Sequence, residues 1–324
     1  MAQHFLLSAA SRSLSLKSIY KDGEDAAYAT FRRLRWPDTD GEAVCPRCGC
    51  TESYGIASRR KFKCQACHHQ FSVTSGTIFH SRKLAFTDLL AAICILVNSA
   101  KGLSAIKLSR DLDVQYKTAF VLAHKLREAM SASQCRETPL NGEVEVDGAY
   151  FGGHVRPHNE KAKRVDRRLK RNQSGTRRVV VAFRERLGRT LPFVAKSEAE
   201  GVALAKRHVA RTASMAADEA SHWDLLHDGW PVDRVNHSEV YSDHGKHTNW
   251  VESYFSRLRR MVAGQHHFVS PKYLYQYANH AAWLEDSRRE SNGALAYRLL
   301  GLGLASKVSR TWKGYWQRGS SALA

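Results

Sequence analysis

The sequence predicts an α/β fold with a mixed sheet, preceded by two smaller modules. Three observations support this prediction. Four cysteines cluster early in the chain, two short helical segments joined by a tight turn follow them, and strand patterns interrupted by a helix come last. A chain of 324 residues is long enough for two or three domains, and its apolar fraction of 43% supports a proper core.

The four cysteines have the spacing of a metal site, C-x2-C-x15-C-x2-C, in which two CxxC knuckles present four thiolates to one Zn²⁺. They are Cys45, Cys48, Cys64 and Cys67. Gly49 permits the tight turn that the first knuckle needs. Two disulfides are the alternative, but they require export and the N-terminus carries no convincing export signal. The pattern therefore predicts a zinc ribbon, a module too small for a pocket of its own and suited to binding.

The charge of the chain indicates a nucleic-acid partner. Fifty Lys and Arg residues stand against 31 Asp and Glu, giving a net charge of +19 and a pI of about 9.8. A membrane surface is the competing partner, but basic membrane anchors are local, whereas this charge is spread along the chain. The longest apolar run, Leu89–Val97, is too short to span a bilayer. Seven cysteines, an odd number, suit a reducing cytoplasm, where we expect the protein to reside.

Helical patterns surround the ribbon. Apolar residues recur at helical spacing over Asp25–Trp36, and Pro37 then breaks the pattern. After the ribbon, the spacing predicts a helix from Ser104, its N-cap, to Asp113, and a second helix from Tyr116. Two short helices joined by a tight turn, the second rich in basic residues, are typical of a helix-turn-helix. A plain helical hairpin explains the segment equally well, and the neighbouring ribbon favours DNA binding.

We predict that basic side chains of these two modules contact DNA. The predicted contacts are Arg59, Arg60, Lys61, Lys63, Lys117, Lys125 and Arg127. A further basic stretch at 154–178, rich in Lys and Arg among Pro, Asn, Gln and Gly, predicts a loop with no sequence preference for DNA.

From residue 140 onward, alternation of polar and apolar residues predicts strands. They begin at Glu143, Arg178, Thr190 and Ser214, with a turn at 187–189. Helices are predicted over Glu198–Thr212 and Asn249–Met261. The order of three strands, a helix, a strand and further helices indicates an α/β layer with a mixed sheet.

Three acids stand out by their placement in these elements. Asp147 lies within a strand, Asp218 ends a strand, and Glu252 lies in the first turns of a helix 34 positions later. Carboxylates from two strands and a facing helix can converge on hard cations such as Mg²⁺, and two such ions clamp the attacking and leaving oxygens of a phosphoryl displacement. Simple surface acids are the alternative, and spacing alone does not choose the second ligand among Asp218, Asp224, Asp228, Asp233 and Asp243.

Several segments make the chain resemble bacterial insertion-sequence transposases of the ISXO-like, zinc-ribbon DDE type, over about 19–287. They are LRWPDTDGEAVCPRCG, KFKCQACHHQFSVTSGTIFHSRK, VEVDGAYFGG, VNHSEVYSD and HTNWVESYFSRLRR. The resemblance implies an RNase H-like catalytic domain that cuts and joins transposon DNA ends with two Mg²⁺ or Mn²⁺ ions. The implied layout is a helical lead-in (1–43), zinc ribbon (44–80), helix-turn-helix (81–135), DDE domain (140–290) and C-terminal tail (291–324).

The resemblance also implies roles for single residues. Asp147, Asp218 and Glu252 match the first, second and third acids. Asn249, one helical turn before Glu252, faces the same side and could replace it as ligand, and Arg259 matches a basic position that contacts DNA phosphate. Two further features concern neighbours of these residues: His237 matches the family pattern without a clear role, and Gly148 and Ala149 replace the acid and hydroxyl residues that often follow the first acid.

The sequence thus predicts a DNA transposase that recognises terminal inverted repeats and cleaves and joins strands. The expected partners are double-stranded DNA of the element ends and the target, with at least a dimer in the synaptic complex and no membrane. A nucleoid-associated, cytoplasmic location follows. Two alternatives remain: a zinc-ribbon DNA-binding regulator with a decayed catalytic domain, and a metal-dependent nuclease that never joins strands.

Overall fold

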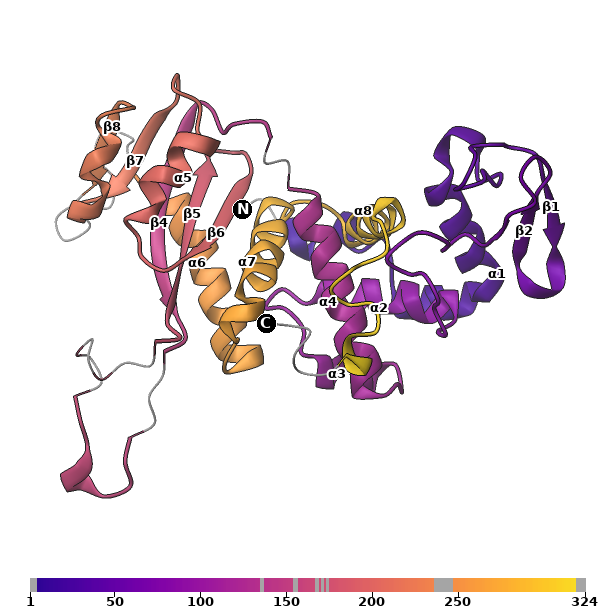
Figure 1. Ribbon diagram of the computed structural model, residues 1–324, viewed down its shortest axis with the longest axis horizontal. Helices are drawn as coiled ribbons and strands as arrows, with labels where there is room; N and C mark the ends of the chain where they lie inside the picture. The colour runs from indigo at the N-terminus through magenta and orange to yellow at the C-terminus, as the bar shows by residue number, and fades with distance from the viewer. Residues whose placement is uncertain are drawn as a thin grey trace. The chain divides into compact units, whose positions relative to one another are not determined.

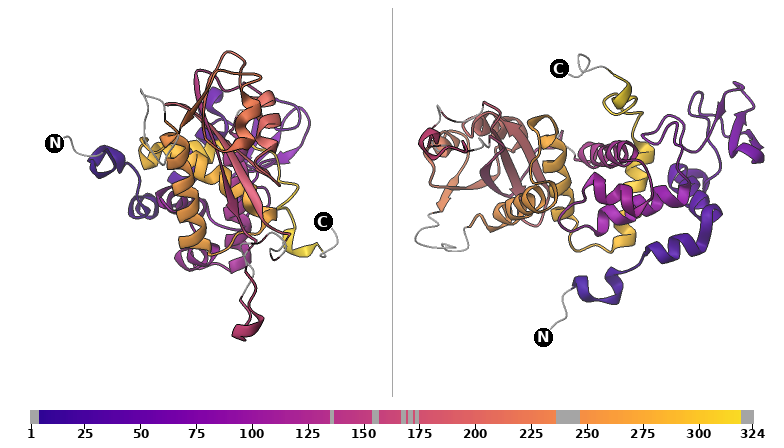
Figure 2. Two further views of the ribbon diagram at one scale, coloured as in Figure 1. Left: turned by 90° about the vertical axis from the view of Figure 1, so that its left-hand side faces the viewer. Right: turned by 90° about the horizontal axis from the view of Figure 1, so that it is seen from below.

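The computed structural model describes the greater part of the chain, in ranges separated by short gaps. They are 5–134, 137–153, 157–166, 169, 172, 175–235 and 247–318. The chain divides into two compact units, one formed by Met1–Ser133 with Ser287–Ala324 and the other by Gln134–Asp286. Figures 1 and 2 show the helices of the first unit and the sheet of the second.

The first unit is a set of helices with a small antiparallel sheet. Its helices are α1 (Leu16–Arg35), α2 (Phe86–Asn98), α3 (Ala105–Asp111), α4 (Tyr116–Ala132) and α8 (Asn292–Ala305). Its strands are β1 (Ser53–Ile56), β2 (Lys61–Cys64) and β3 (Gln70–Phe71), in that order across the sheet. The helix predicted over Asp25–Trp36 is the part of α1 that follows a kink at Gly23, where φ is +81°. The part before the kink begins at a capping box formed by Ser15 and Ser18.

Helix α2 forms the centre of this unit. Its residues Leu89–Val97, the longest apolar run, are all buried, and α1 and α8 pack against it. Helix α8 comes from the segment expected to be a C-terminal tail, and it also packs against α4. The run is apolar on every side because the helix is covered on every side.

The predicted pair of short helices is confirmed as α3 and α4. Ser104 caps α3, since its hydroxyl accepts a hydrogen bond from the Lys107 amide at 3.1 Å. The chain turns through Asp113, which has a φ of +49°, and α4 starts at Tyr116 as predicted. Only the first turn and the last residue of α4 are exposed; from Ala119 to Ser131 its residues are buried or half-buried.

The second unit contains the mixed sheet, with strand order β6-β5-β4-β7-β8. Its strands are β4 (Glu143–Phe151), β5 (Arg178–Glu185), β6 (Thr190–Ala195), β7 (Ser214–Asp218) and β8 (Val232–Val235). Neighbours β4, β5 and β6 pair antiparallel, whereas β4 with β7 and β7 with β8 pair parallel. The predicted α/β fold with a mixed sheet is confirmed. Strand β8 was not predicted, because its four residues, VDRV, are too few and too polar to show an alternation.

Helices cover both faces of this sheet (Figure 1). On one face Val144 and Val146 of β4 join a core with α5 (Glu200–His208) and the 3-10 turn Ser221–Leu226. α6 (Asn249–Met261) and α7 (Pro271–Asp286) pack on the other face, and a π-helical turn, Val262–His266, follows α6.

Buried ion pairs attach α7 to the sheet. Arg184 of β5 lies 3.5 Å from Glu285, which also accepts a hydrogen bond from Arg257 of α6 at 2.8 Å. The side chains of Arg184 and Glu285 are only 3% and 2% exposed, so the charges must be paired where they lie. This network keeps α6 and α7 in place over the face of β4 that carries Glu145 and Asp147.

Candidate active site and zinc site

The four cysteines come together at the two knuckles of the ribbon. The Sγ atoms of Cys45 and Cys67 lie 3.6 Å apart, and those of Cys48 and Cys64 lie 3.5 Å apart. All four ligand atoms are within 4.8 Å of one another. A tetrahedral Zn²⁺ with bonds of about 2.3 Å requires sulfur atoms about 3.8 Å apart, so the four thiols fit this ion. None of the four is in a disulfide, which removes the alternative pairing.

Local backbone geometry favours the metal-binding form of one of these thiols. Gly49 adopts a φ of +75° after the first knuckle, in the left-handed region where glycine is favoured, as the pattern predicted. The amide of Cys67 donates toward Cys64 Sγ, and this contact lowers the pKa of the Cys64 thiol to about 6. A thiolate is the metal-binding form of cysteine, so the turn itself favours the ligand state.

Asp147 and Asp218 lie next to each other in the sheet of the second unit. Val146 pairs with Ala217 in the parallel ladder of β4 and β7, and the two aspartates are the next residues along their strands. Because alternate residues share a face, both aspartates lie on the face covered by α6. Asp218 also accepts a hydrogen bond from the Ala220 amide at 3.2 Å, which fixes its position at the strand end.

The environment of Asp147 opposes its charge. Burial raises the pKa of Asp147 to about 6, and the charges of Asp218 and Glu198 act in the same direction. The Gly148 amide, which donates to Asp147 Oδ1 at 2.6 Å, and the cation of Arg259 act against this shift. Two half-buried carboxylates side by side repel each other, and a bound cation would relieve that repulsion. This donor set therefore fits a divalent ion of the Mg²⁺ type, which prefers carboxylate oxygen.

Glu252 approaches from α6. Seven positions separate it from Arg259, so both side chains lie on one stripe of the helix. Arg259 is close enough to Asp147 to affect its pKa, which directs this stripe toward the aspartates. The Thr248 hydroxyl donates to Glu252 Oε1 at 3.0 Å and holds the carboxylate at the start of the helix. Asn249 is the first residue of α6 and is exposed.

The three acids do not form a closed cluster. Within the described ranges, the four cysteines are the one group of three or more His, Cys, Asp or Glu ligand atoms that all lie within 4.8 Å. The structure therefore brings Asp147 and Asp218 together and places Glu252 on the helix above them, without gathering the three to that distance. Of the other aspartates considered for the second position, Asp224 is paired with Arg234 at 3.3 Å and Asp243 lies outside the described residues. His237, which matches the family pattern, also lies outside them.

Glu145 is a buried acid that was not among the predicted site residues. Its carboxylate accepts hydrogen bonds from the amides of Trp250 and Val251, at 2.8 and 2.9 Å, and so caps the N-terminus of α6. Arg186 and His247 lie 3.5 and 3.1 Å away from it. Burial raises the pKa of Glu145, and these partners counteract that shift. The alternation of VEVDG places Glu145 on the same face of the strand as Asp147, and this pattern could have identified Glu145 from the sequence.

Glu198 is a second acid that the sequence did not indicate. A Cβ added at Gly148 would lie 2.6 Å from Cγ and Oε1 of Glu198, so the glycine makes room for this side chain. His222 Nε2 lies 3.3 Å from Glu198 Oε2. Burial raises the pKa of Glu198, as does the nearby charge of Asp218. The space that a side chain at position 148 would occupy is thus taken by Glu198, from the turn before α5.

The predicted DNA contacts divide into exposed and buried side chains. Arg59, Lys61 and Lys63 are exposed on the ribbon, and Lys117 is exposed in the first turn of α4. Arg60 is engaged with α1, since it pairs with Glu24 and Asp25 at 3.5 and 2.7 Å and lies over the Tyr28 ring.

Lys125 and Arg127 lie deeper in α4 than the sequence suggested. Lys125 is half-buried. The prediction for Arg127 is wrong in this structure: it is only 1% exposed and donates to the Leu103 carbonyl at 2.9 Å. Its basic character was interpreted as a surface feature, but its apolar stem and guanidinium fit an interior position where the Leu103 carbonyl accepts a hydrogen bond from it.

Comparison with known families matches this layout. Residues 139–286 match the ISXO2-like transposase domain, and residues 23–70 match the transposase zinc-ribbon domain. The chain belongs to the ISXO2-like DDE transposases with an N-terminal zinc ribbon. The family predicted from the sequence segments is confirmed, and so is the RNase H-like class of the sheet. Comparison with curated proteins finds no match.

Membership of this family and the geometry of the ribbon support three statements about this transposase. It is a DNA-binding protein, its DDE domain belongs to a nuclease and transposase class, and its four cysteines form a structural zinc site. The ribbon match begins at residue 23, so it includes the half of α1 that Arg60 contacts. Among the described residues, no helix has both the length and the apolarity needed to cross a membrane.

Proposed function

We propose that this transposase recognises the terminal inverted repeats of an insertion sequence and catalyses metal-dependent cleavage and strand transfer of DNA. The observation that supports this proposal is the pair Asp147 and Asp218 on adjacent parallel strands, under a helix that carries Glu252 and Arg259. Two half-buried carboxylates side by side are costly unless they are paired or coordinate a cation, and two-metal phosphoryl transfer on DNA uses such carboxylates.

Each side chain has a separate task in this proposal. Asp147, Asp218 and Glu252 would hold two Mg²⁺ or Mn²⁺ ions, which supply charge stabilisation at the attacking and leaving oxygens of the scissile phosphate. Arg259 is exposed and would contact a neighbouring DNA phosphate. Thr248 orients the Glu252 carboxylate, and Glu145 keeps the start of α6 on the sheet. Water would attack in cleavage, and a DNA 3′-hydroxyl would attack in strand transfer.

Recognition of the ends would lie in the first unit. The ribbon presents Arg59, Lys61 and Lys63, and α4 presents Lys117 in its exposed first turn, the part of a recognition helix that meets base edges. Joining two ends requires two copies of the site, so we expect at least a dimer in the synaptic complex.

Neutral variants of the three acids test this function. In Asp147→Asn, Asp218→Asn and Glu252→Gln, cleavage of end-containing DNA should fall by at least about 10³-fold, whereas binding to the same DNA should persist. Asn249→Ala separates the two candidates for the third ligand, because it alters the same helix turn without removal of an acid. Normal cleavage by all three neutral variants would refute the assignment. Cleavage without joining by the unaltered protein would identify a nuclease. An active Glu252→Gln beside inactive Asp147→Asn, Asp218→Asn and Asn249→Ala would make Asn249 the third ligand.

A further inference from the structure

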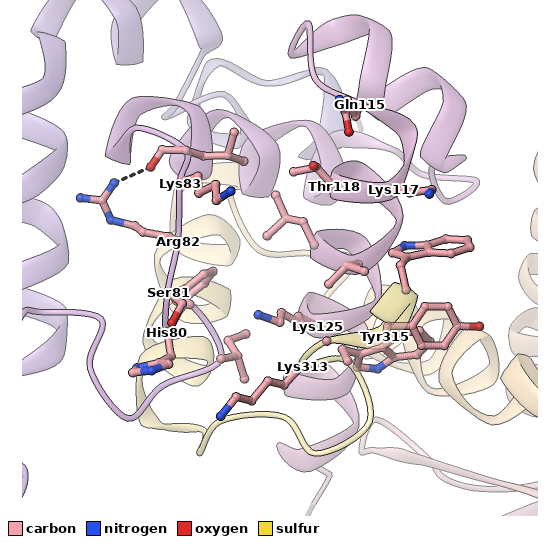
Figure 3. Close-up of a pocket in the computed structure, with 18 of the residues that line it drawn as sticks. His80, Ser81, Arg82, Lys83, Gln115, Lys117, Thr118, Lys125, Lys313 and Tyr315 are labelled. Atoms are coloured by element: carbon pink, nitrogen blue, oxygen red, sulfur yellow. Dashed lines mark hydrogen bonds between the residues drawn. The ribbon is translucent and has the colours of Figure 1, made fainter. Parts of the chain in front are cut away.

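A groove in the first unit is lined by α4, by the segment 78–84 and by the segment 312–317 (Figure 3). Its volume is about 710 Å³, within the range of roughly 300–1,000 Å³ that is typical of ligand pockets. The helix contributes its exposed first turn, including Gln115, Lys117 and Thr118. None of the four cysteines and none of the three acids of the DDE domain lines this groove.

The charged side chains that line the groove are all cationic. Lys83, Lys117, Lys125 and Lys313 are among them, and no Asp or Glu lines it. Figure 3 shows Lys125 extending from α4 into the space between the two covering segments. Burial lowers the pKa of Lys125, although Glu128 acts against this shift. An anionic ligand would stabilise the ammonium group in this position.

An aromatic cluster forms one wall of the groove. Trp312 is only 1% exposed and stacks on His124 of α4 with a centroid distance of 4.2 Å. Trp316, four residues later, is 43% exposed and lies edge to face with Phe120 at 5.7 Å. The buried tryptophan thus anchors the short turn that presents the exposed one. Lys117 Nζ lies 5.5 Å from the Trp316 ring.

This combination selects a ligand that carries both a planar ring and a negative charge. An apolar ligand would bring no negative charge to a groove lined by four lysines, and an acidic peptide without aromatic residues would leave the exposed indole without a stacking partner. Bases in a duplex stack on each other, so their faces are closed to an indole, whereas an unpaired nucleotide offers its face and its phosphate together.

We propose that this groove binds unpaired DNA, with a base stacked on Trp316 and the adjoining phosphates on Lys117, Lys125 and Lys313. The choice of DNA over other nucleic acids rests on the proposed function. The groove includes the first turn of α4, so a strand that frays at an element end would be captured beside the predicted recognition helix.

Binding of a fluorescent oligo-dT to the full chain tests the site without any cleavage step. Trp316→Ala should weaken oligo-dT binding by about 5- to 150-fold, which is the loss of one stacked base. The affinity of Trp316→Ala for a blunt duplex should stay within about twofold of that of the unaltered protein, because the bases of a duplex are not accessible to the indole. Trp316→Phe should retain most of the affinity, and Lys313→Gln should lower the slope of log K against log salt by about 0.7.

Tyr20→Ala is the matched control, since Tyr20 is an exposed aromatic of the same unit that does not line the groove. The proposal fails if Trp316→Ala and Tyr20→Ala bind oligo-dT with the same affinity. It also fails if polyglutamate competes with the fluorescent oligo-dT as effectively as unlabelled oligo-dT does. A protein that cleaves element ends but shows this failure would keep the proposed function and lose the groove. Oligo-dT binding at Trp316 in a protein that never cleaves would support the groove as a binding site and contradict the proposed function.

Discussion

The zinc ribbon and the acidic site solve the same problem, holding like-charged ligands together, in different ways. In the ribbon, four thiols lie within 4.8 Å and the amide of Cys67 already favours a thiolate at Cys64. Around the sheet, Asp147 and Asp218 are neighbours, but Glu252 is held by Thr248 on a separate helix and is not gathered with them. The ribbon has two knuckle turns and few buried side chains, whereas the sheet unit has a continuous core.

This difference teaches that a metal has two roles here. A small module cannot bury enough surface to be stable alone, so its metal contributes folding free energy. A sheet with its own core is folded by apolar burial and tolerates a pair of repelling carboxylates at one face. The metal of the ribbon is therefore expected to be structural, and cations at the acidic site are expected to serve the reaction.

The largest expected effect separates the two regions by removing zinc. We expect one equivalent of Zn²⁺ in protein purified without chelator, with a binding free energy of about 10–16 kcal/mol that is also folding free energy. A strong chelator, or Cys45→Ser, should remove hydrogen-exchange protection from residues 44–76 and leave that of β4 unchanged.

The matched control is Cys50→Ser, which alters a neighbouring thiol outside the four ligands and should keep the full equivalent of zinc. Equal loss of hydrogen-exchange protection in the ribbon and in β4 would show that zinc stabilises both regions and not the ribbon alone.

A smaller effect tests whether the protein itself positions α6. Glu145 caps this helix from inside the sheet face and is 0% exposed, so Glu145→Ala leaves the amides of Trp250 and Val251 without this acceptor and removes one of the two carboxylates beside Arg186. We expect a loss of about 3–5 kcal/mol in the unfolding transition that reports on this unit. Urea denaturation followed by tryptophan fluorescence measures it.

Glu143→Gln is the control, because that side chain lies on the same strand, pairs with the same Arg186 and is 57% exposed. It should change the unfolding free energy by less than about 1 kcal/mol. Equal effects of the two variants would mean that α6 is held by its apolar face alone, and that the acidic site is not positioned by Glu145.

What the sequence could predict follows the same division. The ribbon could be predicted because its ligands lie in two local knuckles with a fixed spacing, and the predicted bounds of α6 are those of the structure. Glu145 and Glu198 were not, because their roles arise from contacts with α6 and with Gly148 that no local pattern records. Arg127 was misjudged for the same reason: only the packing of α4 decides that its guanidinium meets the Leu103 carbonyl.

The smallest expected effect concerns the basic side chains of the ribbon. Lys61 and Lys63 are exposed on β2, whereas Arg60 beside them is paired with Glu24 and Asp25 of α1. If the two lysines neutralise DNA phosphates, Lys61→Gln and Lys63→Gln should each lower the slope of log K against log salt by about 0.9 for duplex DNA. Arg60→Gln should leave that slope nearly unchanged and lower the thermal stability of the ribbon, because its charge is already satisfied by α1. Binding isotherms at several salt concentrations measure the slopes. A steeper loss of slope in Arg60→Gln than in the two lysine variants would mean that DNA displaces the ion pairs to α1, and that the ribbon is not a passive electrostatic surface.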